Sequence, residues 1–500
     1  MQTSTTKFTL AALAAAALST GAPASQAAVP GVIGPTFNLI AGATLTSQPD
    51  GATIYSWGYG CTPGTPLTLT NFQGSATHGP AASCPSVQLP GPTLIVHEND
   101  VVTVNLTNNL PPAAGNTSIL FPGFNVAASA GTPGLMTTEA KNGTTGNSVT
   151  YTFTATKPGT YAYYSGTQTD LQVEMGLFGA IVVLPNAVPT GCRGVGSTLA
   201  GVSGERDSRL AASAYDHADS CYDREYLFQF SEMNSKVHDD VQAQVAACAV
   251  APCPPLNVAL EPYRPNYFLV NGRSMPDLMD TPFNAGYPHQ PYNGNPHMHP
   301  GEKLLMRVIG QGRWQHPFHF HGNHARVLAR DGNLMVAQND VTKLAGPLLF
   351  TVPTVSGQSL DAIFTWTGKG LNWDVYNHKA SDNVPCTPDA SGYHSVVGSP
   401  NFGEWCADHL KPIPVAPPDP TIVAIGQWYA GTPYLGLQNT GSFTNTNEPP
   451  GTLNQNPQSG YAYMWHSHNE REITTNDVFP GGIMSMLLID PPVWVIDEKL

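Results

Sequence analysis

Residues 87–110 read VQLPGPTLIVHENDVVTVNLTNNL and predict two β-strands joined by a turn at residues 98–100. After the turn, apolar residues at 102, 104 and 106 alternate with polar residues at 103, 105 and 107, a pattern typical of a strand with one buried face. Further strands are expected at 149–155, 160–164 and 179–184, separated by turn residues. We therefore predict that a first β-sandwich occupies residues 29–190.

Composition extends this prediction to the whole chain. Of 500 residues, 49 are glycine and 46 are proline, and only 11% are charged. Because glycine and proline interrupt helices, we expect an all-β, antiparallel architecture with few helices, one of them at 239–249. A chain of this length predicts two or three domains. The net charge of -14 argues against a nucleic-acid partner, because phosphates require a basic surface.

The second half of the chain repeats the pattern of the first. The stretch GTYAYYSG from Gly159 and the stretch GYAYMWHSH from Gly460 each precede an apolar strand, which indicates two copies of one sandwich. We predict a second sandwich at 261–500, interrupted by a long loop insertion at about 379–457. A Cys-rich connecting segment at 191–260, with a strand at 224–231, is expected to join the two.

The N-terminus and the cysteines predict export. Residues 1–28 contain Lys7, an apolar run and small residues that fit cleavage after Ala24 or Ala27, which is typical of a signal peptide. No later stretch is long and apolar enough to predict a transmembrane segment. The even number of cysteines predicts disulfides, and sequential pairing is the simplest of 105 pairings. We expect a periplasmic, cell-envelope or extracellular location.

Two histidine pairs point to metal chemistry. Residues 313–324 read RWQHPFHFHGNH and residues 464–468 read MWHSH. Residues two apart in a strand point to one face, so the pairs His319/His321 and His466/His468 each place two imidazoles on one side of a sheet. Imidazole binds zinc, copper, iron and nickel. If the two strands are neighbours, they form a site for one or two metal ions; the alternative is a set of hydrogen-bonded structural histidines.

Several motifs resemble those of the multicopper oxidases, which are built of cupredoxin domains. The stretches PGPTLIVHEND from Pro90, LTNNLP from Leu106 and QVEMGLFGA from Gln172 are similar to that family's first domain. The stretch HPFHFHG from His316, with residues 463–468, is similar to the copper motifs of its last domain. The resemblance implies two cupredoxin-like Greek-key β-sandwich domains and copper as the cofactor.

The resemblance also implies roles for individual residues. His316 matches a nitrogen ligand of the type 1 (blue) copper. The residues His319, His321, His466 and His468 match the last domain's half of the trinuclear oxygen-reducing cluster.

Departures from the family pattern change this expectation. Ser467 stands where the family has the cysteine of the blue site, and Glu472 stands where it has the next histidine. The first domain has lost its copper motifs, because the corresponding positions hold Leu120, Pro122, Tyr164 and Gly166. A serine hydroxyl cannot replace the thiolate of blue copper. We therefore expect neither a type 1 copper nor a complete trinuclear cluster within one chain.

Other residues are weaker candidates for metal binding. His297 and His299 form a third His-x-His pair, which is either a second metal site or a surface loop. His324 either orients a ligand imidazole or lies exposed, and Glu472 either adds an oxygen ligand or holds a ligand imidazole through a hydrogen bond.

Two classes of function remain open from the sequence. The first is a secreted copper protein, acting as a copper oxidoreductase without a blue centre on a small-molecule or metal-ion reductant. The second is a non-catalytic protein that binds, stores or delivers copper, or that serves as a scaffold. A variant of the first class is a subunit that completes its site with another cupredoxin protein in an oligomer.

Overall fold

The computed structural model describes residues 29–64, 68–70, 84–195, 207, 209–376, 378, 383–396, 399–412, 427–428, 435–437, 443–447, 461–490 and 495–496. The predicted signal peptide at 1–28 and much of the predicted insertion at 379–457 lie outside the described residues. Within the described residues the chain is built mainly of strands, which confirms the all-β prediction.

Two five-stranded sheets form the first sandwich. The inner sheet contains β11 (Gly159–Tyr164), β12 (Phe178–Leu184), β5 (Leu94–His97), β1 (Gly31–Ile33) and β4 (Thr68–Thr70), in this order. The outer sheet contains β3 (Thr53–Cys61), β2 (Thr36–Ser47), β6 (Val101–Asn108), β10 (Ser148–Thr154) and β7 (Ala127–Ala130). The alternation predicted for β6 is confirmed, because Val102, Val104 and Leu106 are buried in the core between the sheets.

A seven-stranded and a six-stranded sheet form the second sandwich. The seven-stranded sheet contains β14 (Tyr267–Val270), β13 (Arg224–Met233), β16 (Lys303–Gly310), β24 (Ser359–Thr365), β18 (Ala325–Arg330) and β19 (Asn333–Leu334), with β22 (Leu348–Leu349) beside β18. The six-stranded sheet contains β15 (His297–Met298), β29 (Met484–Ile489), β28 (Tyr461–Ser467), β17 (His316–Phe320) and β23 (Thr351–Thr354), with β25 (Gln427–Trp428) beside β28. Phe318, Trp465 and Leu304 belong to the buried core between them.

Shorter elements complete the fold. The two-stranded pairs are β8 (Thr132–Pro133) with β9 (Thr138–Glu139), β20 (Val336–Ala337) with β21 (Asp340–Leu344), and β26 (Leu435–Leu437) with β27 (Phe443–Asn447). The helices are α1 (Thr169–Glu174), α2 (Ser235–Ala247) and the 3-10 turns η1 (Pro112–Ala114), η2 (Ala218–Ser220), η3 (Asp277–Met279), η4 (Cys406–Asp408) and η5 (Glu470–Ile473).

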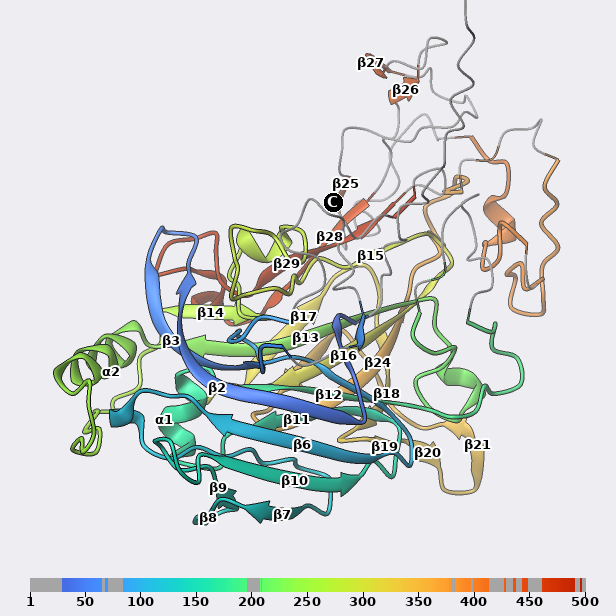
Figure 1. Cartoon of the computed structure of the whole chain (residues 1–500). Coiled ribbons are helices and arrows are strands. Elements are labelled where there is room, and N and C mark those ends of the chain that lie inside the picture. The colour runs from blue at the N-terminus through green and yellow to red at the C-terminus, as the bar shows by residue number, and fades with distance from the viewer. Residues whose placement is uncertain are drawn as a thin grey trace, which may run out of the picture.

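The four sheets stack in layers (Figure 1). The inner sheet of the first sandwich packs against the seven-stranded sheet of the second. Ile95 and Val182 of the first sandwich pack against Leu227 and Ile309 of the second. Buried polar contacts reinforce this interface. Thr160 donates a hydrogen bond of 2.6 Å to Asp361.

The same aspartate has a second partner. Tyr215 donates a hydrogen bond of 2.5 Å to Asp361, and Arg307 donates one of 3.1 Å to Thr160. Asp361 and Arg307 lie on the seven-stranded sheet, so this sheet faces the first sandwich. The six-stranded sheet is therefore the layer farthest from the first sandwich.

The predicted antiparallel pairing is only partly right. The pairs β1–β5, β5–β12, β2–β6, β13–β16 and β15–β29 are parallel. Alternation of apolar residues shows that a strand has a buried face, but it does not show the direction of the neighbouring strand. The sheets are therefore mixed.

The segment predicted to connect the sandwiches contributes to both. Its strand β13 pairs with β14 and β16 inside the second sandwich. Its helix α2 begins at Ser235 rather than at 239, because the side chain of Asn234 caps it by accepting a hydrogen bond from the backbone N–H of Lys236. Val237 and Val241 of α2 are buried against the core of the first sandwich.

All eight cysteines are paired as the sequence predicts. The disulfides are Cys61–Cys84, Cys192–Cys221, Cys248–Cys253 and Cys386–Cys406. Among the helices of the described residues, none has the length and apolarity required to cross a membrane.

Candidate metal centre

His319 and His466 lie on two neighbouring strands of the outermost sheet, and their pair partners His321 and His468 lie one residue beyond the ends of those strands. β17 and β28 pair antiparallel, and His319 stands directly opposite His466. Phe320, between His319 and His321, and Trp465, directly before His466, are buried in the core of the second sandwich. Because side chains alternate along a strand, the histidines project from the opposite face, away from the first sandwich.

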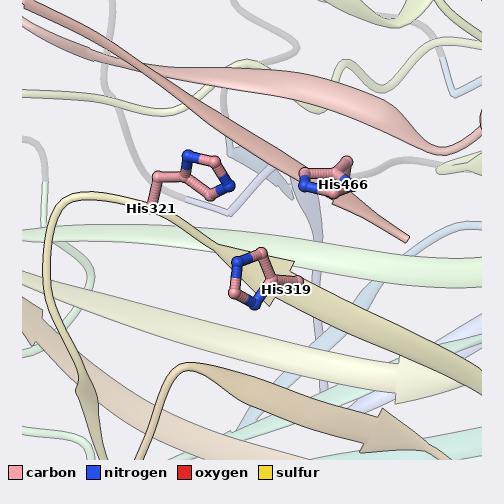
Figure 2. A group of neighbouring side chains, drawn as sticks. All are labelled: His319, His321 and His466. Carbon is pink, nitrogen blue, oxygen red and sulfur yellow. The ribbon is translucent and has the colours of Figure 1, made fainter. Parts of the chain in front are cut away.

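Three of the four rings converge on one point. One ligand nitrogen from each of His319, His321 and His466 lies within 4.8 Å of the other two, and Figure 2 shows the three rings around a common space. The ring of His468 is centred 4.9 Å from that of His319 and 5.7 Å from that of His466. His468 is exposed, whereas the other three are partly buried. The group is therefore open to solvent on one side.

Hydrogen bonds orient two of these rings. Nδ1 of His466 lies 2.8 Å from the carbonyl oxygen of Ser467, which can only accept, so this nitrogen carries the proton and Nε2 holds the free lone pair. Nδ1 of His319 lies 2.7 Å from the hydroxyl of Thr351. The carbonyl contact fixes the tautomer of His466, and both contacts fix the direction of the imidazole ring.

The environment keeps the imidazoles neutral. Burial, together with the neighbouring rings of His321, His466 and His468, lowers the pKa of His319 to about 4. Burial also lowers the pKa of His321 and of His466. Neutral imidazole is the form that binds a metal ion, so the group is ready to do so at neutral pH.

His316 faces the opposite way and has different partners. It lies three residues before His319, so its ring points into the protein, where it is fully buried. Its Nδ1 lies 2.8 Å from Oε2 of Glu472 and its Nε2 lies 3.0 Å from Oε2 of Glu232. Ser467 donates a hydrogen bond of 2.5 Å to the same oxygen of Glu472. Both ring nitrogens are thus engaged by carboxylates.

These contacts make His316 a buried cation. Burial alone would lower the pKa of His316, but hydrogen bonds to Glu232 and Glu472, and the charge of the two carboxylates, raise it to about 9. The place where the resemblance implies a blue copper ligand therefore holds a cluster of one imidazolium, two carboxylates and one serine. We call this group, made of His316, Glu232, Glu472 and Ser467, the buried ion cluster.

Glu232 is the member of this cluster that sequence reasoning missed. It lies on β13, far from His316 in the sequence, and its Oε1 accepts hydrogen bonds from the backbone N–H groups of Arg313 and Trp314. No local motif marks it. β13 carries several other polar and charged residues, so Glu232 does not stand out in the sequence; only its burial shows that the carboxylate requires a partner.

The other candidate residues lie apart from the three converging rings. His297 pairs with the carboxylate of Asp490 at 2.7 Å, and Nδ1 of His299 lies 3.0 Å from the carbonyl oxygen of the same residue. His324 is exposed, and its ring is centred 5.0 Å from Phe350, which also contacts His319. Glu472 belongs to the buried ion cluster.

The first sandwich places no histidine at the positions where the family's motifs map. Backbone hydrogen bonds join Leu120 to Tyr164 within the first sandwich. The hydrogen-bond partners found for the histidine pairs, which include Thr351, Pro317 and Met464, all belong to the second sandwich.

Comparison with known proteins agrees with the resemblance. Residues 81–188 match the family model described as multicopper oxidase, a family that binds copper. No curated protein sequence matches the chain.

Three solved structures of copper proteins match the chain with TM-scores below 0.5. The multicopper oxidase mgLAC is 16% identical, with 92% of this chain and 88% of that chain covered and a TM-score of 0.46. The blue copper oxidase from Nitrosomonas europaea is 15% identical, with 90% and 85% covered and a TM-score of 0.45. The copper nitrite reductase from the same organism is 15% identical, with 66% and 84% covered and a TM-score of 0.39.

The match of residues 81–188 covers most of the strands of the first sandwich. Over this segment, the chain is similar to the multicopper oxidases.

Proposed function

We propose that the chain is a secreted, non-blue copper protein that binds a copper ion through His319, His321 and His466, with His468 as a fourth, exposed ligand. The observation that carries the proposal is the convergence of three ligand nitrogens within 4.8 Å on one face of the sheet. An all-imidazole donor set suits copper, so the residues present fit the cofactor of the related family.

The residues around the site prepare it for binding. Thr351 and the carbonyl of Ser467 hold two rings in place, and the lowered pKa values keep the imidazoles unprotonated. Copper bound there would supply one-electron redox chemistry. Because His468 is exposed, a small-molecule or metal-ion reductant can reach the site directly from solvent.

The proposed oxidoreductase works without a blue centre. Ser467 offers no thiolate, and both nitrogens of His316 are engaged in the buried ion cluster. Electrons would therefore enter at the four-histidine site itself rather than through a separate acceptor.

A copper titration with electron spin resonance tests the proposal. The full chain, produced without a histidine tag, is expected to bind copper tightly with the signal of a non-blue mononuclear site. The variant His466→Ala should weaken binding by more than about 100-fold, because it removes a ligand rather than an outer contact. His97→Ala, which changes an exposed histidine of the first sandwich, serves as the control. A fully reconstituted protein that retains no copper would refute the proposal.

A second candidate function is favoured by one observation, the buried ion cluster. It occupies the place where the resemblance implies the electron-accepting copper, so the chain is also suited to hold or deliver copper without turnover. Oxygen consumption with phenolic, Mn(II) or Cu(I) donors separates the two candidates. Turnover that depends on His466 supports the oxidoreductase, and its absence in fully loaded protein supports the non-catalytic function.

The position of the site also allows a partner to complete it. The histidines project from the outermost layer, so a second cupredoxin protein or another copy of the chain can approach them. The native mass of the protein purified from its producing cell would identify such an assembly.

A further inference from the structure

A second group of metal-binding side chains lies in the second half of the chain and contains none of the four histidines. Asp374 and His378 follow β24, whereas Glu404 and His409 lie on either side of η4. One ligand atom from each of the four lies within 4.8 Å of the other three. Asp374, His378 and Glu404 are buried, and His409 is partly buried.

The distances within this group resemble those around a metal ion. Nδ1 of His378 lies 2.9 Å from Oδ2 of Asp374 and 3.6 Å from Oε1 of Glu404. Nδ1 of His409 lies 2.9 Å from the same oxygen of Glu404 and 3.9 Å from that of Asp374. Four ligands placed tetrahedrally at zinc–ligand distances of roughly 2.0–2.2 Å are about 3.3–3.6 Å apart. The two contacts of 2.9 Å are shorter than this range and have the length of hydrogen bonds, the contact of 3.6 Å lies at its upper end, and that of 3.9 Å exceeds it.

We propose that Asp374, His378, Glu404 and His409 bind a Zn²⁺ ion with structural function. Two imidazole nitrogens and two carboxylate oxygens form a donor set that zinc accepts in tetrahedral sites. The two carboxylates balance the two charges of the ion when both imidazoles are neutral. Since the protein fills all four positions, no position remains for a substrate, which is typical of structural rather than catalytic zinc.

Further contacts hold the carboxylates in place. The backbone N–H of Tyr376 donates to Oδ1 of Asp374 at 2.9 Å, and that of Leu410 donates to Oδ2 at 2.9 Å. The side-chain amide of Asn401 donates to Oε2 of Glu404 at 2.6 Å, while Oε1 faces the two histidines. Outer contacts of this kind orient the ligands of a metal site and strengthen binding.

The buried ion cluster provides a useful contrast. There, one histidine lies between two carboxylates, one on each ring nitrogen, so the partners lie on opposite sides of the ring. In the second group, both histidines turn the same nitrogen, Nδ1, toward the same two carboxylate oxygens. All four ligand atoms thus lie within 4.8 Å of one another, as the ligands of a single metal ion do.

The place of the group in the fold explains what a zinc ion would do. Trp373, Val375 and Tyr376 belong to the buried core of the second sandwich. Glu404 and His409 lie in the insertion that carries the disulfide Cys386–Cys406. Zinc would therefore fasten the described part of the insertion to the second sandwich, close to where the disulfide closes the loop.

Metal analysis of the full chain tests this proposal separately from copper binding. The background variant His319→Ala/His466→Ala removes two ligands of the copper site, so that added zinc reports on the second group alone. We expect one zinc ion per chain to survive dialysis in this background. Adding His409→Ala should remove it, whereas adding His394→Gln, a buried histidine of the same insertion that lies outside the group, should not.

Cobalt provides a measurement that does not require a variant of the zinc group itself to fold. Co²⁺ added to the metal-free background protein is expected to give the intense visible absorption of tetrahedral coordination, and zinc should displace it. An octahedral cobalt spectrum, no bound zinc, or zinc retained after His409→Ala in a folded protein would each overturn the proposal. Copper binding by the wild-type chain can succeed or fail independently of these results.

Discussion

Nδ1 of His316 lies 2.8 Å from Oε2 of Glu472, at the place where the resemblance to the multicopper oxidases implies a nitrogen–copper bond. The resemblance implies that Glu472 stands in the place of a metal ligand of the family. The imidazolium of His316 lies between this carboxylate and that of Glu232, which contacts the other ring nitrogen, so one positive charge faces two carboxylates. Both ring nitrogens of His316 are therefore engaged and neither is left for a copper ion.

The first prediction is that the copper-loaded protein has no intense blue absorption. The colour of a blue site comes from a thiolate bound to copper, and Ser467 provides none. The single change Ser467→Cys should not restore the colour, because Glu472 and Glu232 still hold His316. A visible spectrum of each protein checks this expectation. Intense blue colour in the wild-type chain would show that residue 467 is not the position of the family's cysteine.

The second prediction concerns stability and pH. The pKa of His316 rises from 6.5 in the unfolded chain to about 9 in the folded one. Between these two pH values, the folded state therefore keeps a proton that the unfolded chain has released. The stabilisation is complete below pH 6.5 and is lost as the pH rises through about 9, with a slope of up to about 1.4 kcal/mol per pH unit. Urea unfolding of the metal-free protein at several pH values measures it.

The variant Glu472→Gln is the control for this pH dependence. It keeps a hydrogen-bonding group of similar size but removes one of the charges that raise the pKa of His316. Its loss of stability should therefore occur at lower pH than in the wild type. Superimposable pH profiles of the two proteins would show that the His316–Glu472 contact does not carry the effect.

The third prediction ranks the histidines of the copper site. Changing His319, His321 or His466 to alanine should each lower copper affinity by more than about 100-fold, and His468→Ala should have a smaller effect because its ring is exposed. His324→Ala should have little effect. Isothermal titration with a competing chelator measures all five. A protein that binds copper normally without His466 would place the metal elsewhere.

The fourth prediction concerns Thr351, which touches Nδ1 of His319. Thr351→Val removes this contact at nearly constant volume and should weaken copper binding by about 10–100-fold. Thr342→Val, at an exposed position on β21, is the matched control. Equal affinities of the two variants would mean that the hydroxyl of Thr351 does not orient the ring.

The fifth prediction separates the disulfides from the copper site. Replacing the pair Cys61 and Cys84 by alanine should lower the free energy of unfolding by about 2–4 kcal/mol without changing copper affinity, because no cysteine is among the converging ligands. Chemical unfolding and copper titration of the same sample test both parts. Free thiols in most cysteines of the native protein would contradict the disulfide assignment.

Periodicity made much of this structure predictable from the sequence. The alternation at 101–107 gave a half-buried strand, and the spacing of two between His319 and His321 placed both rings on one face. The same rule separates His316 from His319, since an odd spacing puts them on opposite faces. The expectation that His316 is a copper ligand rests on the family resemblance alone.

Strand directions and side-chain contacts between segments far apart in the sequence were not predictable. The direction of β13 relative to β16, and the contact of Glu232 with His316, join segments that share no local pattern. The zinc group is another example, because Asp374 and Glu404 come together only once the insertion has folded back. Single residues at these positions look like ordinary surface charges in the sequence.

The contacts of Thr160 with Asp361 and Arg307, which join the two facing sheets, have a consequence for how the molecule melts. Separating the sandwiches would break these buried polar contacts, next to apolar surface that also loses its cover. Neither half is therefore expected to open while the other remains intact. Calorimetry should record one cooperative heat-absorption peak for the whole chain, with matching calorimetric and van't Hoff enthalpies.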